Sequence, residues 1–229
     1  MKIVILTGAG ISAESGLGTF RDTGGLWEKF KIEDVATPLA WAKNPELVLD
    51  FYNQRRQQVL EAKPNRAHTA LAQLENHFDV SIITQNIDDL HERAGSTNVL
   101  HLHGEILKAK TSELSDQYFH IDSDLKLGDC CPLGKQLRPH VVWFGEAVPE
   151  MNTAENIVKD ADLFVVIGTS LNVYPAASLI HNIKNKCKLV LIDPNDIKIK
   201  DSKCRFIKEN ATVGVPLLVN ELLENSKIT

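Results

Sequence analysis

The sequence predicts an α/β protein with a doubly wound, parallel, Rossmann-like sheet and a smaller inserted module. Short apolar runs rich in β-branched residues recur along the chain, and such runs are typical of parallel strands covered on both faces. Helical stretches lie between these runs, and this alternation is typical of a doubly wound sheet. A glycine-rich turn follows the first run, as expected where a strand passes into a helix.

Taken in order, five runs are predicted to be strands: 2–7, 80–84, 99–102, 163–168 and 188–193, with 205–207 as a candidate sixth. Helices are expected at 67–76 and 176–184. Residues 28–66 are helical and charged, whereas residues 106–137 are polar with little periodicity. Both stretches break the alternation, so we predict a larger domain of residues 1–27, 67–105 and 138–229 and a smaller module of residues 28–66 and 106–137.

Composition narrows the class of protein. The net charge is -5 and no run of Lys and Arg stands out, which argues against nucleic-acid binding. No stretch is long and apolar enough to span a bilayer, and the N-terminus lacks the features of a signal peptide. Only four cysteines are present, without a disulfide-like framework. We therefore expect a cytoplasmic protein that binds no membrane and exists as a monomer.

The glycine-rich segment 8–16 is the first candidate binding site. Glycines let the backbone approach a pyrophosphate, and the start of the next helix offers N–H donors to the anion. The usual dinucleotide fingerprint would need glycine at position 13, which is Ala13 here. Taken alone, the segment is equally well explained as a tight turn between a strand and a helix.

Gln85, Asn86 and Asp88 follow the predicted strand 80–84. The carboxyl edge of a parallel sheet is where open α/β proteins bind ligands, and these side chains can hydrogen-bond ribose hydroxyls or a carboxamide. The alternative is that they are polar residues capping a turn.

Further motifs follow in order: 18–21 (GTFR), 24–27 (GGLW), 84–88 (TQNID), 100–105 (LHLHGE), 138–146 (RPHVVWFGE) and 168–175 (GTSLNVYP). This ordered set resembles the sirtuin family, and the resemblance covers nearly the whole chain. It implies an enzyme that consumes NAD to remove acyl groups from protein lysines, releasing nicotinamide and an O-acyl-ADP-ribose.

The resemblance also implies residue roles. His103, beside Gly104, matches the catalytic histidine, which acts as general base on a ribose hydroxyl, and we interpret His101 as structural. Phe20 would shield the reactive sugar, and Arg21 would lie beside the phosphates. The residues expected to hold NAD are Gly8, Ala9, Gly10, Ile11, Ser12, Ala13, Thr19, Phe20, Arg21, Trp27, Gln85, Asn86, Ile87, Asp88, Gly168, Thr169, Ser170, Asp193 and Ala211. Asp193 is assigned to the adenosine ribose because Leu191 stands near where the family usually has an Asn.

For the acyl-lysine peptide, the resemblance implies that two flanking loops add the peptide as a strand. The residues concerned are Val142, Trp143, Phe144, Gly145, Glu146, Asn172 and Val173. Val142, Trp143 and Phe144 would wall the acyl-lysine tunnel, although this segment is also explained as a buried strand.

Tyr52 and Arg55 lie three residues apart, on one face of a predicted helix. Their spacing matches the Tyr-x-x-Arg of sirtuins that prefer malonyl, succinyl or glutaryl lysine, with Arg56 pointing elsewhere. Arg offers a fork to a carboxylate and Tyr adds a hydroxyl donor. The alternative is a surface helix with a solvated Arg pair.

Many family members carry two Cys-x-x-Cys pairs, which bind structural zinc, between the positions of Glu105 and Arg138. Here Lys110-Thr111-Ser112 stands where the first pair should start, and Cys130 and Cys131 are adjacent near the second. His120 and His140 are the other available ligands. Because the ligand set is incomplete, we expect no metal and predict a fold without structural zinc.

Three other functions compete with this interpretation. A nicotinamide oxidoreductase fits the glycine-rich start but not its spacing. A non-catalytic sensor of NAD or ADP-ribose would not need His103, Asn86 and Asp88 together. ADP-ribosyl transfer on the same fold is the third alternative.

Overall fold

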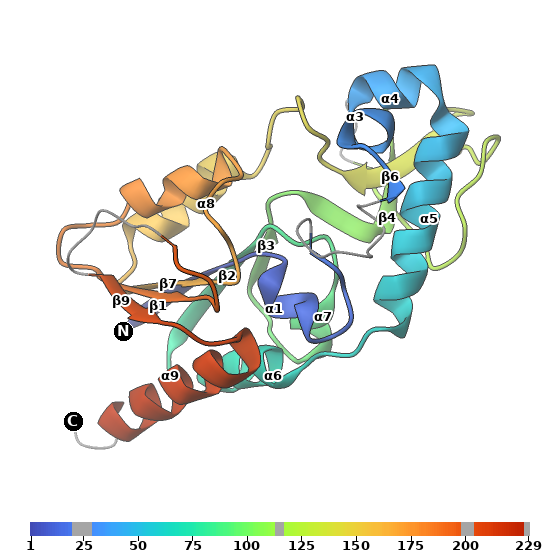
Figure 1. Cartoon of the computed structure of the whole chain (residues 1–229). Helices are drawn as coiled ribbons and strands as arrows, with labels where there is room; N and C mark the ends of the chain where they lie inside the picture. The colour runs from blue at the N-terminus through green and yellow to red at the C-terminus, as the bar shows by residue number, and fades with distance from the viewer. Residues whose placement is uncertain (20–28, 113–116, 198–203, 227–229) are drawn as a thin grey trace.

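A six-stranded parallel sheet lies at the centre of the larger part of the molecule (Figure 1). The structure, a computed structural model, describes residues 1–19, 29–112, 117–197 and 204–226. The strands are β1 (Lys2–Thr7), β2 (Asp79–Thr84), β3 (Val99–His101), β7 (Leu163–Ile167), β8 (Lys188–Ile192) and β9 (Cys204–Ile207). Every strand predicted from the apolar runs, including the sixth, is present. The expectation of a parallel, doubly wound α/β fold is therefore confirmed.

In the strand order β3-β2-β1-β7-β8-β9, the chain adds strands on one side of β1 and on the other side of β7, which are neighbouring parallel strands. The sheet therefore has a topological switch point between β1 and β7. In open α/β folds, ligands bind in the crevice outside the carboxyl ends of the strands at such a point. The glycine-rich segment follows β1, and the Gly168–Ser170 segment follows β7. The topology thus brings two motifs 160 residues apart to the same point.

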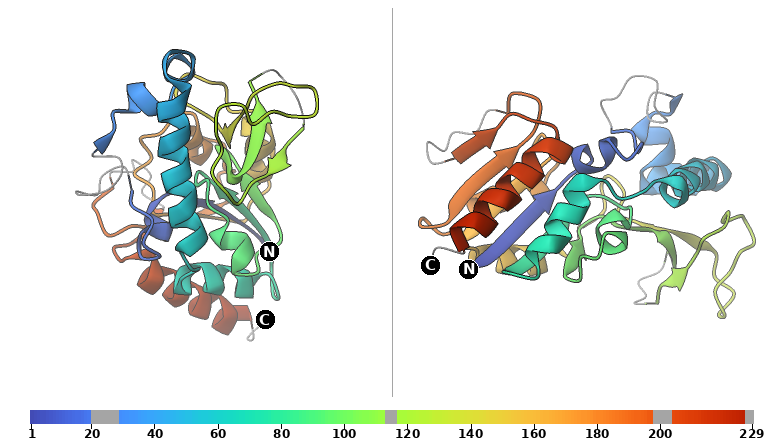
Figure 2. Two further views of the ribbon diagram at one scale, coloured as in Figure 1. Left: turned by 90° about the vertical axis from the view of Figure 1, so that its right-hand side faces the viewer. Right: turned by 90° about the horizontal axis from the view of Figure 1, so that it is seen from below.

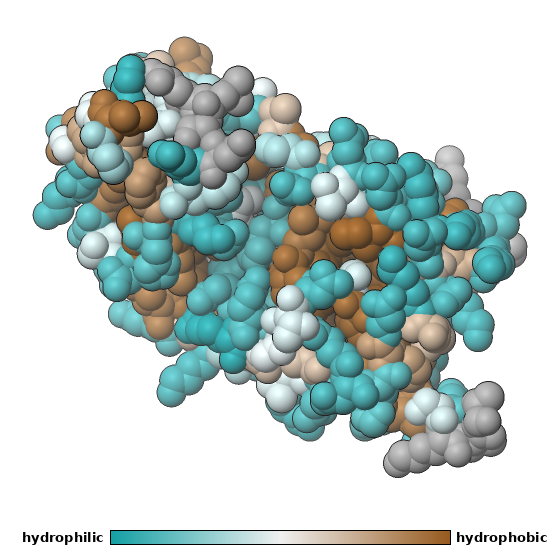
Figure 3. Space-filling model, turned by 180° about the vertical axis from the view of Figure 1, so that it is seen from behind, coloured by the Kyte–Doolittle hydropathy of each residue, from teal (hydrophilic) through white to brown (hydrophobic). Residues whose placement is uncertain are grey.

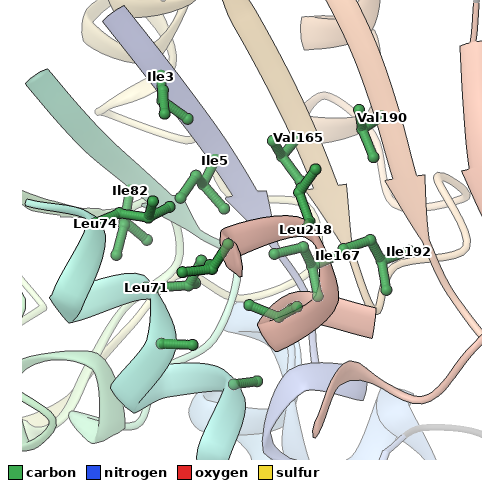
Figure 4. Packing of buried hydrophobic residues seen from close by; sticks show 14 of the residues in the cluster. Ile3, Ile5, Leu71, Leu74, Ile82, Val165, Ile167, Val190, Ile192 and Leu218 are labelled. Carbon is green, nitrogen blue, oxygen red and sulfur yellow. The ribbon is translucent and has the colours of Figure 1, made fainter. Parts of the chain in front are cut away.

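Two helical layers cover the sheet (Figures 1 and 2). On one face, α6 (Arg66–Leu74) and α9 (Ala211–Ser226) pack on buried residues of β1, β2, β7 and β8. Leu71 and Leu74 of α6 and Leu218 of α9 point at the isoleucines and valines of the sheet (Figure 4). On the other face lie α8 (Met151–Lys159) and η1 (Ala176–His181), which is a 3-10 helix. Burial on both faces explains why the strands are continuous apolar runs.

The smaller part contains helices α3 (Ile32–Val35), α4 (Pro38–Lys43) and α5 (Pro45–Glu61). Local sequence explains where α4 and α5 begin. Thr37 accepts a hydrogen bond from Ala40 N, and Asn44 accepts one from Leu47 N, while a proline occupies the first position of each helix. Ser, Thr, Asn and Asp are favoured N-caps, and proline is tolerated at this position because its missing N–H needs no partner.

Residues 104–141 add a three-stranded antiparallel sheet of order β5-β4-β6: β4 (Gly104–Thr111), β5 (Phe119–His120) and β6 (Leu137–Val141). The sheet extends two residues before 106 and four after 137. It packs against α5 through two clusters of buried apolar side chains. We propose that this smaller sheet belongs to the inserted module, and that the six-stranded sheet and its covering helices form the larger domain.

The inserted module is held together by apolar and polar contacts. Leu49, Leu125, Cys131 and Leu137 share one apolar cluster. Asn53 of α5 donates to Leu125 O at 3.0 Å and accepts from Leu125 N at 2.9 Å. Among the described residues, no three His, Cys, Asp or Glu side chains are grouped so as to hold a metal ion.

In the described part of the chain, no helix is both long and apolar enough to cross a membrane. Seen from behind, polar residues cover most of the surface, with apolar residues in patches between them (Figure 3).

Candidate active site

The glycine-rich segment after β1 lies against the segment after β7, backbone to backbone. Gly8 N donates to Ile167 O at 3.0 Å, and Gly10 N donates to Gly168 O at 2.9 Å. A Cβ on Gly10 would meet Gly168 Cα at 2.6 Å, so a side chain at position 10 cannot be accommodated. Gly168 itself has a φ of +60°, which favours glycine. The glycines therefore bring two loops into contact at the switch point of the sheet.

Ser12, in the short helix α1 (Gly10–Ala13), lies at the centre of a buried polar network. Its hydroxyl donates to Asp88 Oδ2 at 3.1 Å and accepts from Asn86 Nδ2 at 3.0 Å. Asp88 also accepts from Leu90 N at 3.2 Å at the start of α7 (Leu90–Arg93). Three residues expected to hold NAD, from two loops, are thus brought together.

His68 of α6 fixes the direction of the Ser12 hydroxyl. Asn65 N donates to Nδ1 of His68 at 3.3 Å, so Nδ1 carries no proton, and the neutral ring carries its proton on Nε2, 3.5 Å from Ser12 Oγ. With two donors already directed at its oxygen, the Ser12 hydroxyl must direct its own proton to Asp88. Burial lowers the pKa of His68 to about 4, so this neutral form persists well below pH 6.

The two buried histidines near Ser12 were not foreseen from the sequence. His68 and His91 are fully buried, and their rings pack edge to face at 4.9 Å. His91 Nε2 lies 3.1 Å from Thr7 Oγ1, which in turn donates to Thr84 Oγ1. Asn65, the N-cap of α6, three residues before His68, was a local signal, because this spacing forms a capping box.

The environment of Asp88 alters the pKa of its carboxyl group. Burial raises the pKa of Asp88, while its bonds from Leu90 N and Ser12 partly oppose that shift. Gln85, from the same loop, donates from Nε2 to Thr169 Oγ1 at 3.2 Å. This side-chain hydrogen bond therefore links the loops that follow β2 and β7.

His103 lies just after β3 with its Nδ1 2.9 Å from Gln85 O. A carbonyl oxygen only accepts, so Nδ1 is the protonated nitrogen and Nε2 carries the free lone pair. Nε2 has no hydrogen-bond partner among the described residues. Burial lowers the pKa of His103, although the bond to Gln85 O opposes this shift, so the ring is neutral at pH 7. It is a candidate general base.

His101 has a different environment. Its Nδ1 lies 3.0 Å from Asn86 O, and its Nε2 lies 2.8 Å from Glu92 Oε1. Both partners are acceptors, which favours the doubly protonated ring. Burial lowers the pKa of His101, but the bond to Glu92 and its charge outweigh burial, and the net shift is upward. A ring engaged at both nitrogens has no free lone pair to act as a base.

The segment after β6 runs beside His103 and then turns sharply. Val142 N donates to His103 O at 2.9 Å, and Phe144 N donates to Ala36 O at 3.0 Å. Glu146 N donates to Trp143 O at 3.0 Å, and Gly145 at the third position of this turn has a φ of +90°. Such a turn needs glycine at this position. The segment expected to bind peptide is thus hydrogen-bonded both to His103 and to Ala36 in the helical part of the module.

Helix α5 places Tyr52 and Arg55 on its inner side. Tyr52 is buried, with its ring 5.0 Å from that of Phe51 and 6.5 Å from that of Trp143. Burial raises the pKa of Tyr52 to about 12, which keeps its hydroxyl a neutral donor at pH 7. Burial also lowers the pKa of Arg55, and the charge of Asp88 acts on Arg55 in the opposite direction. Arg55 is therefore near enough to Tyr52 and Asp88 for both groups to act on its charge.

The other residues expected to bind NAD or peptide differ in how far they are buried. Asp193 is buried after β8 and accepts from Asn195 N at 2.9 Å, and Ala211 is buried at the start of α9. Asn172 is exposed, whereas Val173, Ala9, Ala13, Thr19, Ile87 and Ser170 are partly exposed. Phe20, Arg21 and Trp27 lie outside the described residues.

The donor set fits a dinucleotide. The hydroxyls of Ser12 and Thr169, the amide of Asn86 and the carboxylates of Asp88 and Asp193 all follow parallel strands, at the edge where open α/β folds bind ligands. The fold and site therefore define a dinucleotide-binding α/β protein with a neutral histidine, His103, bonded to the loop after β2.

The model of the Sir2 family matches residues 8–175, and this chain belongs to that family. A protein of Bacteroides thetaiotaomicron named "NAD-dependent protein deacylase" is 50% identical over 229 residues, covering 97% of this chain and 98% of the relative. The crystal structure of a Sir2 homologue–NAD complex superposes with a TM-score of 0.89 at 39% identity, covering 98% of this chain and 90% of that one. A Sir2 homologue mutant in complex with 2'-O-acetyl ADP-ribose has the same TM-score and identity, covering 98% and 93%. The expected membership of the sirtuin family is confirmed, and NAD is the cofactor.

Proposed function

We propose that this protein is an NAD-dependent protein-lysine deacylase with His103 as its general base. One observation carries the proposal. The bond between His103 Nδ1 and Gln85 O leaves the lone pair on Nε2, beside the loops that fit NAD. The names of the relatives and the 2'-O-acetyl ADP-ribose complex of a similar structure support the same chemistry.

In the proposed reaction, bound NAD supplies an activated ribose carbon that the acyl oxygen attacks as nicotinamide leaves. Asn86, Ile87 and Asp88 bind nicotinamide beside Ala9 and Ile11, and Thr169 and Ser170 bind ribose and phosphate oxygens. Neutral His103 then takes a proton at Nε2 from a ribose hydroxyl, which attacks the imidate carbon. Water completes the transfer and gives free lysine and an O-acyl-ADP-ribose. A general base contributes about 10²- to 10⁴-fold to such a step.

We further propose that the acyl group carries a carboxylate, as in succinyl- or malonyl-lysine. Arg55 is a cation that burial alone disfavours, and Tyr52 is a neutral buried donor beside it. A ligand carboxylate between them would accept hydrogen bonds from both side chains. Arg56, although next in sequence, donates to Ile106 O and Asn53 Oδ1 and does not compete for this role.

The test compares succinyl-lysine with butyryl-lysine, which has the same length without the carboxylate. A hydrogen bond to a charged group contributes about 1.5–3 kcal/mol, which is roughly 10- to 150-fold in kcat/KM. Arg55→Met should reduce the succinyl/butyryl ratio of kcat/KM by this factor, mainly through KM. Tyr52→Phe should do the same more weakly. Equal loss of both activities would mean that Tyr52 and Arg55 are structural.

The rival functions have distinct signatures in the same assay. Reduction of NAD, seen as absorbance of NADH, would indicate an oxidoreductase. Transfer of labelled ADP-ribose to protein without deacylation would indicate an ADP-ribosyltransferase. We also propose that the protein acts as a cytoplasmic monomer on proteins and has no role in nucleic-acid binding, in keeping with its net charge of -5.

A further inference from the structure

Trp143, on the wall of the proposed acyl pocket, is held from behind by a buried cation. The guanidinium carbon of Arg138 lies 3.3 Å from the centre of the Trp143 ring. Arg138 has only 5% of its side chain exposed and donates from Nη2 to Val141 O at 2.7 Å. A guanidinium stacked at this distance fixes the plane of an indole and contributes a cation–π attraction.

Glu146 completes this support. It accepts two bonds from Arg138, at 2.7 Å from Nη1 and 3.1 Å from Nη2, and its Oε2 also accepts from Trp143 N at 2.8 Å. The bonds to Arg138 outweigh burial and lower the pKa of Glu146, so its charge is retained. One carboxylate thus holds both the cation behind the indole and the backbone of the residue that carries it.

Tyr52 is an aromatic neighbour of Trp143. The two rings lie 6.5 Å apart with an interplanar angle of 36°, and the Trp41 ring lies 5.8 Å from that of Trp143. Trp143 and Tyr52 are both 2% exposed, so neither ring can move without displacing the other. A shift of Trp143 would therefore shift the Tyr52 hydroxyl.

We infer that Arg138 and Glu146 are positioning residues that set acyl specificity by holding Trp143 against Tyr52. This inference rests on the proposed function, because it assigns the Tyr52 hydroxyl to the acyl carboxylate. Arg138 does not need to touch the substrate, and Glu146, although expected to bind the peptide, would act on specificity through its bonds to Arg138 and to Trp143 N. Their bonds are made within the chain, and their effect passes through two aromatic rings to one hydroxyl donor.

The test measures the succinyl/butyryl ratio of kcat/KM in Arg138→Lys and Glu146→Gln. Lys keeps the charge but loses the planar stack and the two-pronged contact, and Gln keeps the shape but loses the charge. Both variants should reduce the ratio about threefold to tenfold, as expected for one neutral hydrogen bond, with the KM for NAD unchanged. Arg205→Lys is the matched control, since Arg205 makes a two-pronged pair with Glu221 far from the pocket. It should leave the ratio unchanged.

A double-mutant cycle makes the inference specific. In a Tyr52→Phe background, Arg138→Lys should no longer alter the ratio, because the hydroxyl on which it acts is absent. The inference is overturned if Arg138→Lys and Glu146→Gln leave the ratio unchanged, or if Arg138→Lys alters it equally in the Tyr52→Phe background. Arg55→Met separates this outcome from failure of the proposed function. If Arg55→Met lowers the ratio and the other two do not, only the positioning inference fails.

Discussion

Replacing Arg56 with methionine tests how the inserted module is held together. Arg56 is fully buried in α5 and donates to Ile106 O at 3.1 Å, to Asn53 Oδ1 at 2.6 Å and to Ser123 O at 3.3 Å. Met fills most of the same volume but leaves Ile106 O and Ser123 O without this donor, whereas Asn53 Oδ1 keeps its bond from Leu125 N at 2.9 Å. Leaving a buried acceptor unsatisfied costs about 1–3 kcal/mol. The bond to Ser123 is long, so we expect a total loss of about 2 kcal/mol.

The assay is urea unfolding followed by circular dichroism, with the free energy of unfolding extrapolated to water. The exposed residue Gln58 on the same helix supplies the control, because Gln58→Met should alter this free energy by less than about 0.5 kcal/mol. Chelation with EDTA should change neither protein, since we expect no structural zinc. A loss below about 1 kcal/mol for Arg56→Met, or stoichiometric zinc with unfolding on chelation, would refute this explanation of the module.

Three further predictions concern the site. Because burial lowers the pKa of His103, the acid limb of the kcat/KM profile should lie below pH 6.5, and a limb above that pH would contradict the neutral base. His68 has a folded pKa of about 4 against 6.5 unfolded, so its stabilisation is present above pH 6.5 and is lost as the pH falls to 4. The loss amounts to about 3 kcal/mol, and His68→Gln should remove it, as urea unfolding at both pH values would reveal. Gly10→Ala should raise the NAD dissociation constant at least tenfold in calorimetry, since its Cβ would meet Gly168 Cα at 2.6 Å, and unchanged affinity would mean that the loops have room to separate.

Much of the larger sheet could be predicted because its strands are buried on both faces and are therefore continuous apolar runs. The helix expected at 176–184 is instead the shorter 3-10 helix η1. The smaller sheet was not predicted, and its sequence explains why. A β-bulge between Glu105 and Ala109 interrupts the alternation of β4, and Thr111 and Pro139 occupy positions that would otherwise be large and apolar.

The residues of the site also differ in whether the sequence predicts them. Motifs with short spacing, such as the glycine-rich segment and the pair Tyr52 and Arg55, could be recognised in the sequence. Arg56 was expected only to point away from Arg55, and its burial could not be foreseen because it donates to backbone carbonyls 50 and 67 residues away. The contact of Arg138 with Trp143 likewise depends on a turn whose shape is fixed by Glu146 and Gly145.

His103 is proposed as the base of an NAD-dependent deacylation, and replacing it with alanine tests this role directly. The rate of lysine deacylation by His103→Ala is measured with saturating NAD and acyl peptide, and the NAD dissociation constant of the same variant is measured by calorimetry. If His103 is the base, turnover falls by about 10²-fold or more while NAD still binds within a few-fold of the unaltered protein. Near-normal turnover in a folded His103→Ala protein would contradict this role.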